Sequence, residues 1–263
     1  MADCHLAMLY DLGVESFLQE ADFIEAFVPR DNDLLQGAVV GYLNRQGLGY
    51  STTIHEDTDW NAEWEAHFEA VHIGDSITIR APFHHRKEGT AVDLVLSPRM
   101  AFGTGHHETT YMLLEWMAEM DWKGKEVLDF GCGTGILGIY ALLCGAESCC
   151  FVDCDPVCIE NAVENLNLNE LGKQLCILGS SPELPTASRY DRILANITRN
   201  ALSEHLLALQ RALKPQGMMA LSGLLEADLE SILEQAASLG FSVQAIKRRG
   251  EWRAVILGTQ SLR

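Results

Sequence analysis

The sequence lacks the features expected of a membrane, secreted or nucleic-acid-binding protein. No apolar run reaches the roughly 18 residues that a membrane span needs, and the start of the chain does not combine a basic region with an apolar core. Basic side chains are few: 19 Lys and Arg stand against 37 Asp and Glu, so the formal net charge is −18. A charge of this sign repels phosphate backbones. We therefore expect a cytoplasmic protein that binds neither membranes nor nucleic acid directly and whose partner is basic.

A metal-binding cysteine framework is also lacking. Five of the 8 cysteines crowd into one stretch without paired C-x-x-C spacing. Small buried positions in a reducing compartment suit such cysteines, so we expect no metal site. The crowded residues are Cys144, Cys149, Cys150, Cys154 and Cys158.

Length and composition indicate a globular protein with one large domain or two unequal ones. The chain has 263 residues, of which 48% are hydrophobic and 21% charged. The residue pattern changes near residue 90. We therefore expect an α+β substrate-recognition domain with a linker over residues 1–90, and a second domain over residues 91–263.

The first of these domains is predicted to contain three strands and one helix. This is most of a ferredoxin-like split βαβ unit without its opening strand and helix, so the unit is either built differently or begins late. The strands are expected at Val14–Glu20, Asp22–Val28 and Tyr50–Ile54, and the helix between Asn32 and Leu43.

The segment between the domains combines an aromatic stripe with a polar stretch. Trp60, Trp64 and Phe68 fall four residues apart, so a short helix would place them on one face, either packed between domains or facing a substrate. The polar HHRKEG stretch predicts a hinge near Phe83–Ala91.

Strands and helices alternate from Lys125 onward, which predicts a Rossmann-like, mostly parallel sheet covered by helices on both faces. The last two strands are joined by a short turn and are predicted to pair antiparallel. Strands are expected at Glu126–Phe130, Ser148–Asp153, Lys173–Leu178, Tyr190–Asn196, Met218–Ser222, Phe241–Lys247 and Trp252–Leu257. Helices are expected at Ile136–Cys144, Asp155–Asn165, Ala201–Leu213 and Ala227–Leu239, the third of which is stopped by Lys214–Gly217.

A glycine-rich loop, in the sequence VLDFGCGTGIL, follows the first strand of this sheet. Gly131, Gly133 and Gly135 allow the backbone to turn tightly and to approach a ligand closely. Asp153 ends the next strand about 20 residues further on, where a carboxylate can bind both hydroxyls of a ribose. The third glycine of the dinucleotide fingerprint and the Lys-Ser/Thr ending of a phosphate-binding loop are both missing.

These residues resemble the S-adenosylmethionine site of class I methyltransferases, whose cofactor has no phosphates and needs no anion-binding loop. The segments SPRMAFGTGHHETTYMLLEW, FVDCDP and ILANITRN, together with the glycine loop, resemble the PrmA family over roughly Asp59 to Trp252. Members of that family methylate amino groups of large-subunit ribosomal protein L11. The resemblance implies S-adenosylmethionine as cofactor and L11 as partner, and we expect the enzyme to be a monomer.

The resemblance also implies a set of site residues. Cofactor contacts fall on Thr110, Gly131, Asp153 and Asn196, the loop is completed by Gly133 and Gly135, and Phe102, Gly103, Thr104 and Gly105 would form a flexible cover. The residue types fit this assignment, because glycines make the segment mobile, a phenylalanine supplies an apolar cover, and Thr109 or Thr110 suits a helix cap.

Two places depart from the family pattern, and a third lacks an acid that many class I methyltransferases have. Glu108 stands where proline is usual, and Thr198–Asn200 replace small residues. Gly179–Ser181 offer no acid for the adenine amine.

The expected reaction is attack of a neutral amine on the sulfonium methyl group, so the protein must mainly orient the amine and exclude water. Asn196 is the residue expected to orient it. His106 and His107 are either general bases or structural residues at a helix start. Two other functions fit the glycine loop: methylation of a small molecule or another protein's lysine, and a regulatory module that binds an adenosyl ligand without turnover.

Overall fold

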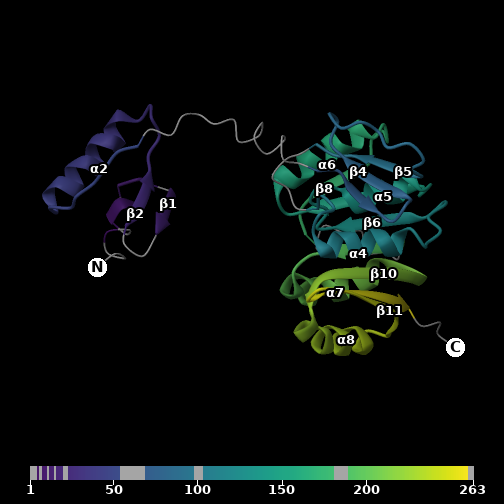
Figure 1. Cartoon of the computed structure of the whole chain (residues 1–263). Coiled ribbons are helices and arrows are strands. Elements are labelled where there is room, and N and C mark those ends of the chain that lie inside the picture. Colours follow the sequence, from purple (N-terminus) through teal and green to yellow (C-terminus); the bar gives the residue numbers. More distant parts are fainter. Residues whose placement is uncertain are drawn as a thin grey trace. The chain divides into compact units, whose positions relative to one another are not determined.

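The computed structural model divides the chain into two compact units, Met1–Thr58 and Asp59–Arg263 (Figure 1). Each unit is described separately. The described residues are 5, 8–10, 12–14, 16–19, 23–53, 69–97, 103–180 and 189–259.

The first unit contains a two-stranded antiparallel sheet and a helix. Strands β1 (Ser16–Gln19) and β2 (Ile24–Phe27) pair antiparallel, and helix α2 spans Asp33–Arg45. The helix begins after Asn32, whose side-chain oxygen accepts a hydrogen bond from the Leu35 N–H at 3.0 Å. A small apolar core is formed by Leu9, Val14, Val39 and Tyr42. The two predicted strands and the helix are confirmed.

Two predictions for residues 50–68 are not confirmed. The strand expected at Tyr50–Ile54 is wrong over residues 50–53, which are exposed and irregular, so that no apolar side of a strand is buried. Ile54 lies outside the described residues. The predicted helix with Trp60, Trp64 and Phe68 also lies outside them.

The second unit is built on a seven-stranded sheet with the order β11-β12-β10-β9-β6-β7-β8. Its strands are parallel except for β12, which pairs antiparallel with both of its neighbours. The prediction of a mostly parallel sheet with an antiparallel last pair is confirmed. The strands are β6 (Glu126–Phe130), β7 (Ser148–Asp153), β8 (Leu175–Leu178), β9 (Tyr190–Asn196), β10 (Leu213–Leu225), β11 (Phe241–Arg249) and β12 (Trp252–Thr259).

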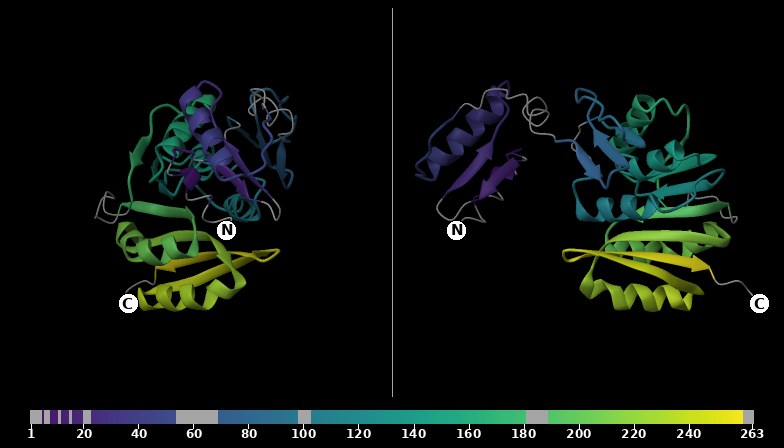
Figure 2. Two further views of the ribbon diagram at one scale, coloured as in Figure 1. Left: turned by 90° about the vertical axis from the view of Figure 1, so that its left-hand side faces the viewer. Right: turned by 45° about the vertical axis from the view of Figure 1, so that its right-hand side comes forward.

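Helices cover both faces of this sheet because successive residues of its strands point to opposite faces. Val127 and Phe151 pack into an apolar core with helices α4 (Glu108–Met117), α5 (Ile136–Leu143) and α6 (Pro156–Leu168). Leu128 and Val152 pack into the opposite core with α7 (Arg199–Ala212) and α8 (Leu229–Ser238), which follows a short 3-10 turn at Glu226–Asp228. Figure 2 shows both helical layers.

Helix α7 ends before Lys214–Gly217, as predicted, and these residues form an irregular part of β10. Pairing with β9 shifts register between Leu213 and Met218, and Gln216 has a φ of +64°. The strand expected at Met218–Ser222 therefore begins earlier, with a bulge, because Leu213 already pairs with Tyr190.

A second, three-stranded sheet corrects the predicted domain boundary. It consists of β3 (Val71–Ile73), β4 (Ile77–Arg80) and β5 (Val92–Val95). Ile73, Ile79 and Leu94 are buried in the same apolar core as α4 and α5, beside which this sheet lies (Figure 2). Residues 71–90 consequently belong to the second unit, and the division falls after Thr58 rather than at residue 90.

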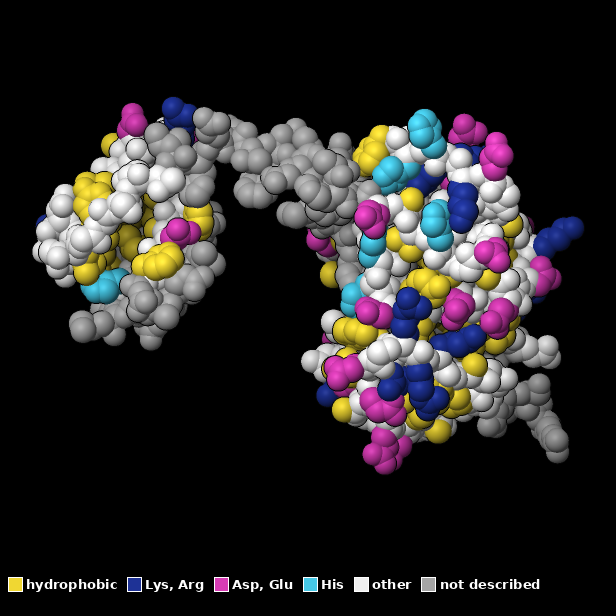
Figure 3. Space-filling view, in the orientation of Figure 1, with side chains coloured by type: hydrophobic (Ala, Val, Ile, Leu, Met, Phe, Trp, Pro, Cys, Tyr) yellow, Lys and Arg dark blue, Asp and Glu magenta, His cyan; other side chains and the backbone are white. Residues whose placement is uncertain are grey.

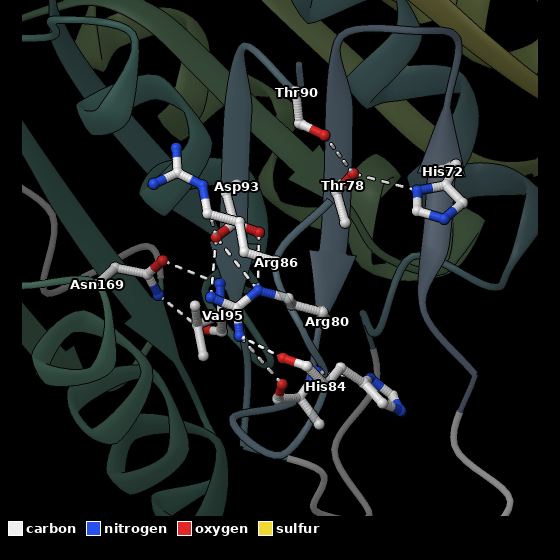
Figure 4. A network of polar contacts seen from close by, with 10 residues as sticks. His72, Thr78, Arg80, His84, Arg86, Thr90, Asp93, Val95 and Asn169 are labelled. Carbon is white, nitrogen blue, oxygen red and sulfur yellow. Dashed lines mark hydrogen bonds and ion pairs between the residues drawn. The ribbon is translucent and has the colours of Figure 1, made fainter. Parts of the chain in front are cut away.

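The hinge predicted near Phe83–Ala91 is wrong as a hinge between domains, because this segment joins β4 to β5 inside one unit. Arg80 bonds both carboxylate oxygens of Asp93, from Nε at 2.9 Å and from Nη2 at 2.9 Å (Figure 4). Its Nη1 donates to the carbonyl oxygen of His84 at 3.0 Å. This largely buried ion pair therefore ties the polar segment to the sheet.

The described part of the chain contains neither a candidate membrane span nor a candidate metal cluster. None of its helices is long and apolar enough to cross a bilayer. It holds no group of three His, Cys, Asp or Glu side chains placed to bind a metal ion. Among the crowded cysteines, Cys149 and Cys150 are buried as predicted, whereas Cys154 is exposed because it follows the end of β7.

Candidate functional site

The glycine loop lies at the carboxyl end of β6, where ligands bind in open α/β sheets. Gly131, Gly133 and Gly135 have φ values of +70°, +53° and +77°, a region that other residues rarely adopt. The Gly131 N–H donates to the Val152 carbonyl oxygen at 2.8 Å, and a Cβ on Gly131 would collide with the Ile197 side chain. The loop thus turns tightly and leaves no space for side chains at this point.

Asp153 ends β7 and contacts the glycine loop directly. Its Oδ2 accepts a hydrogen bond from the Gly133 N–H at 3.0 Å, and its Oδ1 accepts one from the Asp155 N–H at 3.0 Å. The side chain is partly exposed. An ionised carboxylate has about four lone-pair sites, so this one retains capacity for two hydroxyl donors. The position of Asp153 is therefore suitable for a residue that binds the hydroxyls of a ribose.

A second carboxyl group, that of Asp129, is buried beneath the loop. Its Oδ2 accepts a hydrogen bond from the Gly138 N–H in the first turn of α5, at 2.9 Å. The pKa of Asp129 is raised from 3.8 to about 7: burial raises it most, the Gly138 hydrogen bond lowers it, and the negative charge of Asp153 raises it. Asp129 holds the start of α5 and changes protonation near neutral pH.

Asn196 and Thr110 meet although they are 86 residues apart in the chain. Asn196 ends β9, and its Nδ2 donates to the Oγ1 of Thr110 in the first turn of α4, at 3.1 Å. The side-chain oxygen of Asn196 is buried and has no hydrogen-bond partner among the described residues. Since a buried acceptor without a donor is costly, this atom indicates a place where a ligand N–H or O–H binds.

The histidines of the HHETT segment have different surroundings. His107 is the N-cap of α4: its Nδ1 accepts from the Thr109 N–H at 3.3 Å, and its ring meets that of Trp252 edge to face, with 4.8 Å between centroids. The predicted cap at Thr109 or Thr110 is therefore wrong, since both residues are buried inside the first turn. His106 is exposed, with its Nδ1 3.1 Å from the Oγ1 of Thr104.

The predicted cover reaches the glycine loop through Gly103. Its carbonyl oxygen accepts a hydrogen bond from the Oγ1 of Thr134 at 2.7 Å, and its φ of +104° favours glycine. Gly105 has a φ of +88°, and a Cβ there would collide with Ile79. Thr104 is half-buried, and Phe102 lies outside the described residues.

Asn161 and Asn165 of α6 and its C-cap residue Asn169 were not predicted from the sequence. Asn165 donates to the Thr134 carbonyl oxygen at 2.8 Å and accepts from the Ser97 N–H at 2.7 Å. Asn169 bonds both backbone groups of Val95, as Figure 4 shows. The spacing of Asn161, Asn165 and Asn169, four residues apart on one helix face, was the available signal.

The strand order, the glycine loop after β6 and the carboxylate at the end of β7 define a Rossmann-like methyltransferase fold. A solved ribosomal protein L11 methylase from Lactobacillus delbrueckii subsp. bulgaricus has the same fold, with a TM-score of 0.68 and 24% sequence identity. The match covers 74% of this chain and 100% of that one.

The sequence comparisons define the family more narrowly. The family model for ribosomal protein L11 methyltransferase (PrmA) matches residues 8–260. The chain belongs to this family, as its motifs predicted. A ribosomal protein L11 methyltransferase from Porphyromonas gingivalis is 37% identical over 254 residues, covering 95% of this chain and 88% of the relative. One from Tolumonas auensis is 38% identical over 207 residues, covering 79% and 70%.

Proposed function

We propose that this protein uses S-adenosylmethionine to methylate amino groups of ribosomal protein L11. The observation that carries the proposal is the buried, unpaired side-chain oxygen of Asn196, held beside Thr110 at the carboxyl end of β9. Family membership supports the substrate, because the relatives bear the name of that activity.

The residues present fit the cofactor. Asp153 offers a partly exposed carboxylate for the ribose hydroxyls, and Gly131 and Gly133 let the backbone pass close to the amino-acid part of the cofactor. Thr110 and Asn196 complete the binding residues, with Gly135 shaping the loop and Phe102–Gly105 as the cover. When bound, the cofactor supplies an electrophilic methyl group on a sulfonium.

The side-chain oxygen of Asn196 orients the attacking amine. It accepts one N–H of the neutral amine, so that the nitrogen lone pair is directed at the methyl group. A lysine side chain has an ordinary pKa of about 10.4, so one proton must leave for solvent before attack. The Nδ1 of His107 caps α4, which fits the structural alternative for this residue.

The net charge of −18 favours a basic protein substrate. The charge is not spread as a uniform acidic surface: Lys and Arg side chains lie among acidic ones on the face of the second unit shown in Figure 3. Long-range attraction to a lysine-rich protein thus comes from the whole molecule and weakens as salt screens it.

The direct test is incubation of the protein with S-adenosylmethionine and unmodified L11, followed by mass measurement of L11 peptides. The expected result is mass gain in steps of one methyl group on lysine or N-terminal amines, and slower gain with Asp153→Ala at limiting cofactor concentration. Methylation of free lysine or of other basic proteins at equal rate would contradict the assigned substrate. An unchanged L11 mass in the presence of a bound cofactor would refute the proposed activity.

A further inference from the structure

Thr134, in the glycine loop, is hydrogen-bonded through both its side chain and its backbone. The residue is fully buried. Its Oγ1 donates to the Gly103 carbonyl oxygen at 2.7 Å, and its own carbonyl oxygen accepts from the Nδ2 of Asn165 at 2.8 Å. The site residues on the loop are therefore tied to Gly103 on one side and to α6 on the other.

Asn165, which is also fully buried, extends this connection to the end of the small sheet. Its Oδ1 accepts from the Ser97 N–H at 2.7 Å, two residues after β5 ends. Asn169, one helical turn later, bonds the N–H of Val95 at 3.0 Å and its carbonyl oxygen at 2.6 Å (Figure 4). The backbone leaving β5 is thus fixed to α6 by two amide side chains.

We propose that Thr134 and Asn165 are positioning residues for cofactor binding, because together they hold Ser97 and Gly103 against the glycine loop. The inference rests on the proposed function, since it takes this loop as the cofactor site. Both side chains are buried and form their hydrogen bonds with other residues of the protein. They therefore act through the backbone segments that they hold. A Cβ on Gly103 would come within 2.9 Å of the Thr134 Oγ1, which shows how closely the two segments meet.

The hydroxyl of Thr134 can be removed with little change of shape. Valine has the same branching as threonine without the hydroxyl, and serine keeps the hydroxyl. The Gly103 carbonyl would lose its donor in Thr134→Val and regain it in Thr134→Ser. Ser242→Ala is the matched control, because it removes another hydroxyl-to-carbonyl hydrogen bond, to Gly258 at 3.2 Å, at the far edge of the sheet.

The experiment measures binding of S-adenosylhomocysteine by calorimetry and amide hydrogen exchange of residues 103–105 in the full chain. We expect Thr134→Val to raise Kd about tenfold, or about 1.4 kcal/mol, while kcat at saturating cofactor changes less than about threefold. In the absence of ligand, amide exchange at residues 103–105 should be faster in Thr134→Val than in the wild type. Thr134→Ser should restore both values, and Ser242→Ala should change neither.

The outcomes separate this inference from the proposed function. If Thr134→Val and Asn165→Leu bind the ligand like the wild type, the positioning role is refuted even where their melting temperatures fall. If Thr134→Val does not fold, Asn165→Leu carries the test alone, with the same expected rise in Kd. If the wild type itself binds no S-adenosylhomocysteine, the proposed function fails and the positioning role fails with it.

Discussion

The side-chain amide of Asn196 donates a hydrogen bond to the Thr110 hydroxyl oxygen at 3.1 Å, joining the end of β9 to the first turn of α4. This bond fixes which way the amide faces. Its oxygen is consequently left buried, without a donor in the part of the chain that the structure describes. The orientation of the atom proposed to receive the amine therefore depends on a residue in another element.

Replacing Asn196 should affect the reaction more than cofactor binding. We expect Asn196→Ala to lower kcat about 100-fold, because the amine is no longer aligned, with a smaller rise in the Kd for S-adenosylhomocysteine. Thr110→Val keeps the amide but frees its orientation and should lower kcat about tenfold, whereas Thr110→Ser should be near the wild type. Steady-state kinetics on L11 measure these values. A wild-type kcat for Asn196→Ala would contradict the orienting role.

Asp153 and its neighbour Asp155 provide a matched pair for testing cofactor binding. Asp153→Ala should raise the Kd of S-adenosylhomocysteine about 10- to 100-fold, since hydrogen bonds to a charged group are worth about 1.5–3 kcal/mol. Asp155 instead caps α6, with its Oδ1 accepting from the Val157 N–H at 2.8 Å. Asp155→Ala should therefore cost about 1 kcal/mol of stability and leave Kd unchanged. Calorimetric titration and denaturant unfolding separate the two effects, and equal Kd values for both variants would count against a ribose contact.

Local sequence patterns predicted the part of the site that local structure determines. The glycine loop, Asp153 and the flanking strands follow from residue types over short windows, and the structure has them where predicted. The domain boundary did not follow, because Ile73 and Ile79, which precede residue 90, are buried in the same core as α4 and α5.

Contacts between residues far apart in the chain could likewise not be predicted from the sequence pattern. Asn165 and Ser97 are 68 residues apart in the chain, and only the fold brings them together. The cap of α4 was misassigned because the Nδ1 of His107 accepts the hydrogen bond from a first-turn N–H that a threonine side-chain oxygen usually accepts. The early start of β10 was not predicted because Lys-Pro-Gln-Gly is typical of a break in regular structure, whereas Leu213 pairs with β9 before it.

The buried carboxyl of Asp129 should make stability depend on pH. Its folded pKa of about 7 lies above the ordinary 3.8, so its contribution to stability is full below pH 3.8 and is lost as pH rises through 7. Asn in its place keeps an oxygen for the Gly138 N–H but does not ionise. Measured by urea unfolding, the stability of Asp129→Asn relative to the wild type should increase by more than about 1.4 kcal/mol, the equivalent of one pKa unit, between pH 4 and 8. A pH-independent difference would show that Asp129 does not titrate in this range.

Two helical glycines should respond oppositely to the same substitution. Gly37 in α2 is exposed, and a Cβ there would contact nothing within 4 Å. Gly37→Ala should therefore stabilise the first unit by about 0.5–1 kcal/mol through helix propensity.

Gly138 in α5 is buried, and a Cβ there would collide with the Phe151 ring and with the Cys149 Sγ at 2.6 Å. Gly138→Ala should destabilise the second unit by about 1–3 kcal/mol despite the same gain in helix propensity. It should also weaken cofactor binding, because the Gly138 N–H holds Asp129 under the loop. Thermal unfolding of each variant, monitored with and without S-adenosylhomocysteine, measures both effects. If Gly138→Ala were as stabilising as Gly37→Ala, the close packing of α5 on β7 at Gly138 would be contradicted.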